Sequence, residues 1–78
     1  MATIIVVDDR DEARTTALRL LRHEGYDAVG ARTGQDAVRS LEQAAADLLL
    51  LNVRRADGLR LLHLLRETPQ WKSLPVVM

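Results

Sequence analysis

Two neighbouring carboxylates follow the first apolar run of the chain. The sequence begins MATIIVVDDR, so Asp8 and Asp9 stand directly after apolar residues 4–7. Adjacent carboxylates offer the oxygen ligands that a hard cation such as Mg²⁺ prefers. Acids are also common in a turn before a helix, because the positive end of the helix dipole favours negative charge. Taken alone, the pair allows both a metal site and a solvated turn, and it favours the turn.

A second polar group stands at the end of a later apolar run. Asn52 follows four leucines, and Arg54 and Arg55 precede Asp57 and Gly58. The two arginines form an ordinary solvated pair, or one guanidinium enters the acidic pocket and replaces a metal, since carboxylates favour a nearby cation. We interpret Asp57 as the N-cap of the next helix in preference to a chemically reactive carboxylate, because aspartate is a strong N-cap residue.

The elements that must hold these side chains follow from hydrophobic spacing. Short apolar runs between polar segments predict strands, and apolar residues at helical spacing predict helices. Residues 48–51, all leucine, favour a helix intrinsically, but the run is short and lies between turn-prone segments, so we predict a buried strand. The predicted elements are strand 3–7, helix 11–24 closed by Gly25, strand 27–31, helix 33–43 capped by Thr33, strand 48–53, helix 58–67 capped by Asp57, and a strand starting at residue 75.

The alternation of strands and helices predicts an α/β fold with a parallel sheet and right-handed crossovers. Sites in such folds lie at the carboxyl ends of the strands. Asp8, Asp9 and Asn52 all stand at predicted carboxyl ends. We therefore expect them to meet at one edge of the sheet.

Composition narrows the possible partners. Eleven basic residues balance eleven acidic ones among 78 residues, so no net charge favours nucleic acid or an anionic membrane. The absence of cysteine excludes disulfides and thiolate metal sites. The first apolar run is too short for a signal peptide or a membrane span. We expect a cytoplasmic protein that binds neither nucleic acid nor membrane directly.

Five segments of the chain, in this order, resemble the receiver domains of response regulators in bacterial two-component signalling: IIVVDD, HEGYDAVGARTGQDAV, DLLLLNV, DGLRLLHLLR and LPVVM. The resemblance implies a flavodoxin-like parallel sheet with strand order 2-1-3-4 for the part of the fold that is present. It also implies that residues 1–78 form a partial receiver domain, truncated in the fourth strand. Such an open strand edge leads us to expect a homodimer or another homo-oligomer.

The resemblance implies a site as well. Asp8 and Asp9 match the acidic pair that holds Mg²⁺, Asn52 matches the phosphoacceptor aspartate, and Asp57 and Gly58 match the Asp-Gly that opens the third helix. Two departures affect this site. An amide replaces the acceptor carboxylate, and the loop is shorter than the family's, since Gly58 comes six positions after Asn52. The hydroxyl residue and the lysine that respond to phosphorylation in the family have no counterpart in these 78 residues.

We therefore predict a receiver-like signalling module that is not an enzyme, does not depend on phosphorylation and acts by contact with protein partners of a signalling pathway. No cofactor is expected, and Mg²⁺ is expected to bind weakly or not at all. Two alternatives stay open. One is an active, Mg²⁺-dependent phosphoacceptor receiver, and the other is a small Mg²⁺-dependent phosphatase with an aspartate nucleophile at Asp8 or Asp9.

Overall fold

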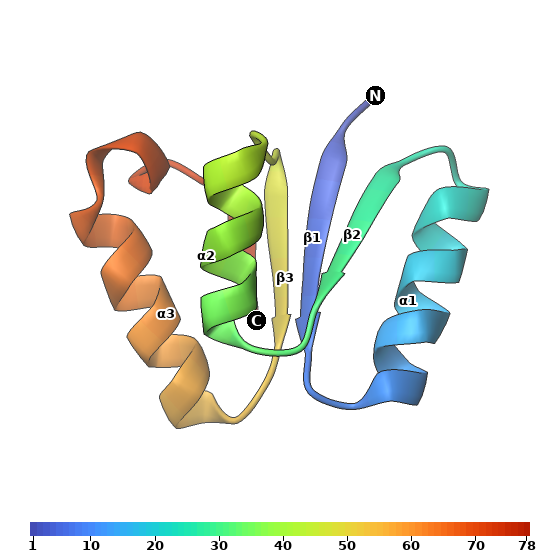
Figure 1. The fold of residues 1–78 in the computed structure, drawn as a ribbon, viewed down its shortest axis with the longest axis horizontal. Coiled ribbons are helices and arrows are strands. Elements are labelled where there is room, and N and C mark those ends of the chain that lie inside the picture. The colour runs from blue at the N-terminus through green and yellow to red at the C-terminus, as the bar shows by residue number, and fades with distance from the viewer.

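The computed structural model describes residues 1–78 and contains one parallel sheet. Its strands are β1 (Thr3–Asp8), β2 (Asp27–Ala31), β3 (Leu48–Asn52) and β4 (Val76–Val77). They lie in the order β2-β1-β3-β4, which confirms the predicted fold (Figure 1). The leucine run is a strand, as predicted, because β3 pairs with β1 on one side and β4 on the other and so occupies a buried central position.

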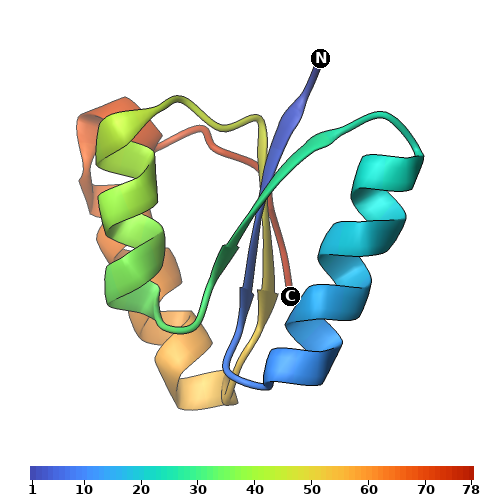
Figure 2. The ribbon, with the colours of Figure 1, turned by 45° about the vertical axis from the view of Figure 1, so that its right-hand side comes forward.

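Three helices cover the two faces of the sheet unequally. Helix α1 (Asp11–His23) lies on one face, and α2 (Gly34–Gln43) and α3 (Arg55–Glu67) lie on the other (Figures 1 and 2). Gly25 follows α1 with a φ of 92°, the left-handed conformation predicted for the end of this helix. No helix has the length and apolar character needed to cross a bilayer.

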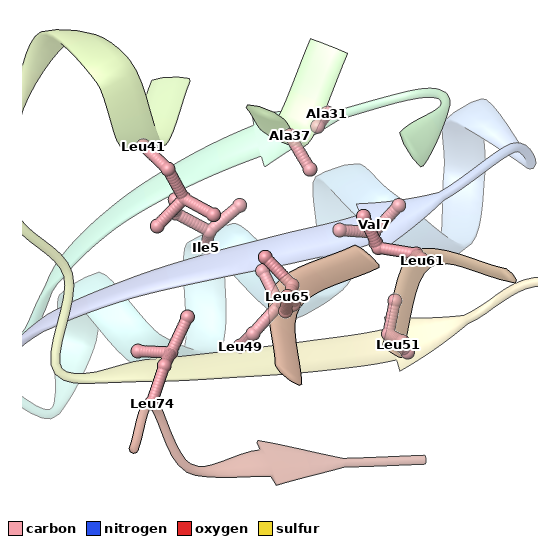
Figure 3. Close-up of a cluster of buried hydrophobic side chains, with 10 residues drawn as sticks. All are labelled: Ile5, Val7, Ala31, Ala37, Leu41, Leu49, Leu51, Leu61, Leu65 and Leu74. Atoms are coloured by element: carbon pink, nitrogen blue, oxygen red, sulfur yellow. The ribbon is translucent and has the colours of Figure 1, made fainter. Parts of the chain in front are cut away.

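The main core lies between the sheet and the α2–α3 layer. Alternate residues of β1 and β3 point to this side, where apolar residues of α2 and α3 meet them (Figure 3). The buried cluster consists of Ile5, Val7, Ala31, Ala37, Leu41, Leu49, Leu51, Leu61, Leu65 and Leu74. In contrast, α1 has no fully buried residue. The α2–α3 side therefore carries most of the packing that holds β1 and β3 in register.

The start of α3 differs from the prediction. Arg54, not Asp57, is the N-cap residue, and α3 begins at Arg55. The backbone N–H of Gly58 donates to the carbonyl oxygen of Arg54 at 2.9 Å, which closes the first turn three residues earlier than expected. Asp57 lies inside that turn, where its charge still suits the helix dipole. The N-cap prediction for Asp57 was wrong. Aspartate is favoured both at the N-cap and in the first turn of a helix, so the residue type alone does not distinguish the two positions.

Candidate functional site at the carboxyl edge of the sheet

The pairing of β1 with β3 brings Asp8 and Asn52 side by side. They are direct partners in the register of the two parallel strands. The Asn52 amide nitrogen Nδ2 donates a hydrogen bond to Asp8 Oδ2 at 2.9 Å. Only this orientation of the amide is favourable, since the amide oxygen would face carboxylate lone pairs. The edge predicted from the sequence is therefore formed, and Asn52 acts there as a donor.

Arg10 occupies the other oxygen of the same carboxylate. Its backbone N–H donates to Asp8 Oδ1 at 2.9 Å, and its Nε lies 3.4 Å from that oxygen. The backbone bond spans two residues, which is the geometry of an Asx turn. Asp8 is only 2% exposed, so its charge needs these partners. Both oxygens of the buried carboxylate thus accept hydrogen bonds from the protein itself.

The ionisation of Asp8 reflects this environment. Burial of the carboxyl acts to raise its pKa, but hydrogen bonds from the backbone and side chain of Arg10, the Asn52 amide and the charge of Arg10 act in the opposite direction. The net result is a pKa of Asp8 below its ordinary value. Asp8 is therefore ionised at neutral pH, and its charge is held by Arg10 and Asn52.

A second set of contacts anchors the strand end to α1. Arg14 donates to the backbone carbonyl oxygen of Asp8 at 2.8 Å and to Asp11 Oδ1 at 2.7 Å. Arg32 lies 3.4 Å from the same Asp11 oxygen. The hydrogen bond from Arg14 and the charges of Arg32 and Arg14 lower the pKa of Asp11. Arg14 thus positions the backbone of Asp8 but does not contact its carboxylate.

The other predicted site residues do not join this cluster. Asp9 is exposed and makes no side-chain hydrogen bond or ion pair, and the same holds for Arg54 and Arg55. Asp57 pairs with Arg60 at 3.4 Å. Gly58 is buried, and a Cβ there would lie 2.7 Å from the end of the Met78 side chain and 3.6 Å from Val53. The guanidinium beside the acidic pair belongs to Arg10, not to Arg54 or Arg55.

Arg10 was not among the residues predicted for this site. A signal for it exists, because a residue two positions after an aspartate can close an Asx turn and so bring its own side chain next to the carboxylate. Arg54 and Arg55 were predicted to lie near the acidic pair because they belong to the loop after Asn52. That loop enters α3 directly, and no contact turns either guanidinium toward Asp8.

A family model for the response regulator receiver domain matches residues 4–78. The chain belongs to this family of receiver domains. It is therefore a receiver domain of two-component signalling, with the parallel sheet of the family. The resemblance described above matches Asp8 and Asp9 to the family's acidic pair and Asn52 to its phosphoacceptor, and this assignment stays a prediction.

Individual receivers and regulators are similar over the whole chain. The transcriptional regulatory protein CpxR of Escherichia coli is 36% identical over 80 residues, covering 100% of the chain and 33% of CpxR. Chemotaxis protein CheY4 of Vibrio cholerae is 26% identical with a TM-score of 0.87, covering 97% of the chain and 65% of CheY4. The crystal structure of histidine kinase ThkA in complex with response regulator protein TrrA contains a similar chain, 27% identical with a TM-score of 0.85, over 97% of this chain and 66% of that one. This receiver thus spans less than two thirds of CpxR and CheY4.

The chemistry available at the acceptor position of this receiver is limited. The nitrogen lone pair of the Asn52 amide is delocalised into its carbonyl, and the amide carries no charge that a phosphoryl group or a cation could use. Its N–H group already donates to Asp8. Asn52 therefore stabilises a neighbouring carboxylate and does not act as a nucleophile.

The residues of this edge do not fit the family's Mg²⁺. The ion requires several oxygen ligands at short, nearly octahedral distances. Both oxygens of Asp8 take protein hydrogen bonds, and only Asp9 offers a free carboxylate. No group of three or more histidine, cysteine, aspartate or glutamate side chains is placed to hold a metal ion. A bound ion would compete with Asn52 and Arg10 for the oxygens of Asp8.

Proposed function

We propose that this chain is a cytoplasmic, non-catalytic receiver module whose signalling does not require phosphorylation and proceeds by contact with protein partners. One observation carries the proposal. The residue at the acceptor position is an amide, and its N–H group is bonded to Asp8 at 2.9 Å. A phosphoryl group would meet no nucleophile there, and the acidic residue that would assist it is already neutralised by Arg10.

The surface next to the site has a groove that could bind another protein. An open groove between α2 and α3 is lined by apolar Val38, Leu61 and Leu64 and bordered by Arg32 and Arg39. Leu64 is 47% exposed although it is a large apolar residue. Apolar floors with charged rims are typical of protein interfaces. The family member TrrA forms a complex with the histidine kinase ThkA, which supports a protein partner of a signalling pathway here.

We expect the chain to be inert toward small phosphodonors. Incubation with acetyl phosphate and Mg²⁺ should leave its intact mass unchanged, because Asn52 cannot form an acyl phosphate. A receiver domain with aspartate at the acceptor position, treated in the same tube, controls for the donor. A stable phosphoryl adduct on Asn52, Asp57 or the acidic pair would contradict the proposal and would favour the active phosphoacceptor receiver. Turnover of a phosphate ester would favour the phosphatase.

We also propose that the chain associates with a second copy. Val77 and Met78 are 54% and 56% exposed, and β4 pairs only with β3 in this structure. An apolar strand edge of this kind favours pairing with another strand. Sedimentation velocity over a range of micromolar concentrations should show a dimer in exchange with monomer. A sedimentation coefficient that stays at the monomer value at every concentration would contradict this prediction.

A further inference from the structure

The negative charge of Asp8 is already balanced by a positive side chain, without any added ion. Asp8 is buried, and Arg10 supplies a positive charge at 3.4 Å. Asn52 adds a donor but no negative charge, so the edge lacks the third carboxylate that an acceptor aspartate would contribute. A divalent ion would therefore enter a site that already holds one cation and has one anion fewer than the family pattern. Electrostatics alone lowers its affinity.

The two donors hold Asp8 in different ways. Asn52 donates a short bond to Oδ2 from a strand that is fixed by the sheet register. The side chain of Arg10 is 64% exposed and its Nε contact with Asp8 is longer, whereas the backbone N–H of Arg10 is held by the turn itself. Removal of the Arg10 side chain takes away the charge but leaves the turn. Replacement of both side chains therefore removes the positive charge and the amide donor from Asp8, while the backbone N–H of Arg10 stays on Oδ1.

The other arginines at this edge do not contact the Asp8 carboxylate. Arg14 is committed to the carbonyl oxygen of Asp8 and to Asp11. Arg54 lies in the loop after Asn52, carries the same charge as Arg10, and has no ion pair. Arg54 is thus a matched control that changes the net charge of the edge by the same amount without touching the carboxylate.

We infer that Arg10 and Asn52 together replace the divalent ion of this receiver: the guanidinium supplies the positive charge and the amide supplies the donor that keep Asp8 paired. The inference rests on the proposed function and deepens it, because it explains how an acidic receiver site stays assembled without metal. It differs from that proposal in its test, which measures metal binding and not phosphorylation.

Calorimetric titration with MgCl₂ tests the inference on the 78-residue chain and four variants. The wild type and Arg54→Ala should show no saturable binding at millimolar Mg²⁺. Arg10→Ala and Asn52→Asp should each gain measurable affinity. The double variant should bind about tenfold or more tightly than either single variant, since Arg10→Ala removes a competing positive charge and Asn52→Asp replaces a donor to Asp8 with a carboxylate ligand. MnCl₂ should reproduce the same order.

A second measurement guards against a variant that folds poorly. The urea midpoint of the wild type should not respond to Mg²⁺, whereas the midpoint of the double variant should rise. If the double variant is unfolded without metal, Mg²⁺ should restore its helical circular dichroism, because binding to the folded state alone shifts the equilibrium. A double variant that neither binds Mg²⁺ nor responds to it would overturn the inference.

Two further results would overturn it as well. One is saturable Mg²⁺ binding by the wild type as tight as that of the double variant. The other is an equal gain from Arg54→Ala and Arg10→Ala, which would assign the effect to net charge and not to the Asp8 contact. A wild type that binds Mg²⁺ and still takes no phosphoryl group would sink only this inference. Phosphorylation of the chain would sink the proposed function.

Discussion

Replacement of Leu65 by alanine should remove a large part of the stability of the chain. Leu65 is fully buried and lies in the middle of the cluster between the sheet and α3 (Figure 3). Leucine-to-alanine changes in such positions cost about 3–5 kcal/mol, because transfer free energy is lost and a cavity remains. A domain of this size has a total stability of about 4–12 kcal/mol. The urea midpoint, followed by circular dichroism, should fall by about 3–5 M for a slope near 1 kcal/mol per M.

The neighbouring leucine provides the control. Leu64 is one position away in the same helix but 47% exposed. Leu64→Ala should change the free energy of unfolding by less than about 1 kcal/mol, since it opens no cavity and alanine favours the helix. Equal losses from Leu64→Ala and Leu65→Ala would show that helix propensity, and not packing against the sheet, decides the stability of α3.

The fold could be predicted from the sequence, because the local hydrophobic patterns and the order of the elements along the chain both indicate a parallel sheet. Residues 3–7 and 48–51 are too short and too apolar for surface helices, and the alternation of elements leaves a parallel sheet with right-handed connections. That topology alone predicts that Asp8 and Asn52 meet, since parallel strands end at one edge. The register of β1 with β3 then makes them direct neighbours.

The side-chain contacts at this edge could not be predicted from the sequence in the same way. Spacing places Arg10, Arg54 and Arg55 near the acidic pair, but side-chain direction depends on the local backbone. The Asx turn at Asp8 brings Arg10 next to the carboxylate, and the early start of α3 places Arg54 at the N-cap position. Asp57 failed as a cap for a similar reason, because first-turn and N-cap acids are favoured by related electrostatics. Contacts of this kind are set by dihedral angles that composition does not encode.

Restoring an aspartate at the acceptor position should destabilise the metal-free chain. In Asn52→Asp, a carboxylate replaces the donor that now lies 2.9 Å from Asp8 Oδ2. The loss of a hydrogen bond to a charged group costs about 1.5–3 kcal/mol. Repulsion between the two carboxylates adds about 1 kcal/mol in a largely solvated setting, which applies because Asn52 is exposed. The free energy of unfolding in EDTA at pH 7.5 should fall by about 2–4 kcal/mol.

The pH dependence of this variant should have the opposite sign to that of the wild type. The pKa of Asp8 is lowered in the folded wild type, so its stabilising contribution is present above the unfolded pKa of about 4 and is lost as the pH falls below it. In Asn52→Asp, a like charge raises the pKa of one carboxyl of the pair, so the folded state binds a proton more readily than the unfolded state. The difference in the free energy of unfolding between this variant and the wild type should therefore become smaller as the pH falls from 7.5 to 5.

Asn52→Ala separates the two causes. It removes the donor without adding a charge, so its deficit should be smaller than that of Asn52→Asp at pH 7.5 and should not shrink between pH 7.5 and pH 5. Urea unfolding of the wild type and both variants at the two pH values, in EDTA, measures these differences. If Asn52→Asp is as stable as the wild type at pH 7.5, the amide does not hold Asp8. If both variants lose the same stability at both pH values, the hydrogen bond matters and the repulsion does not.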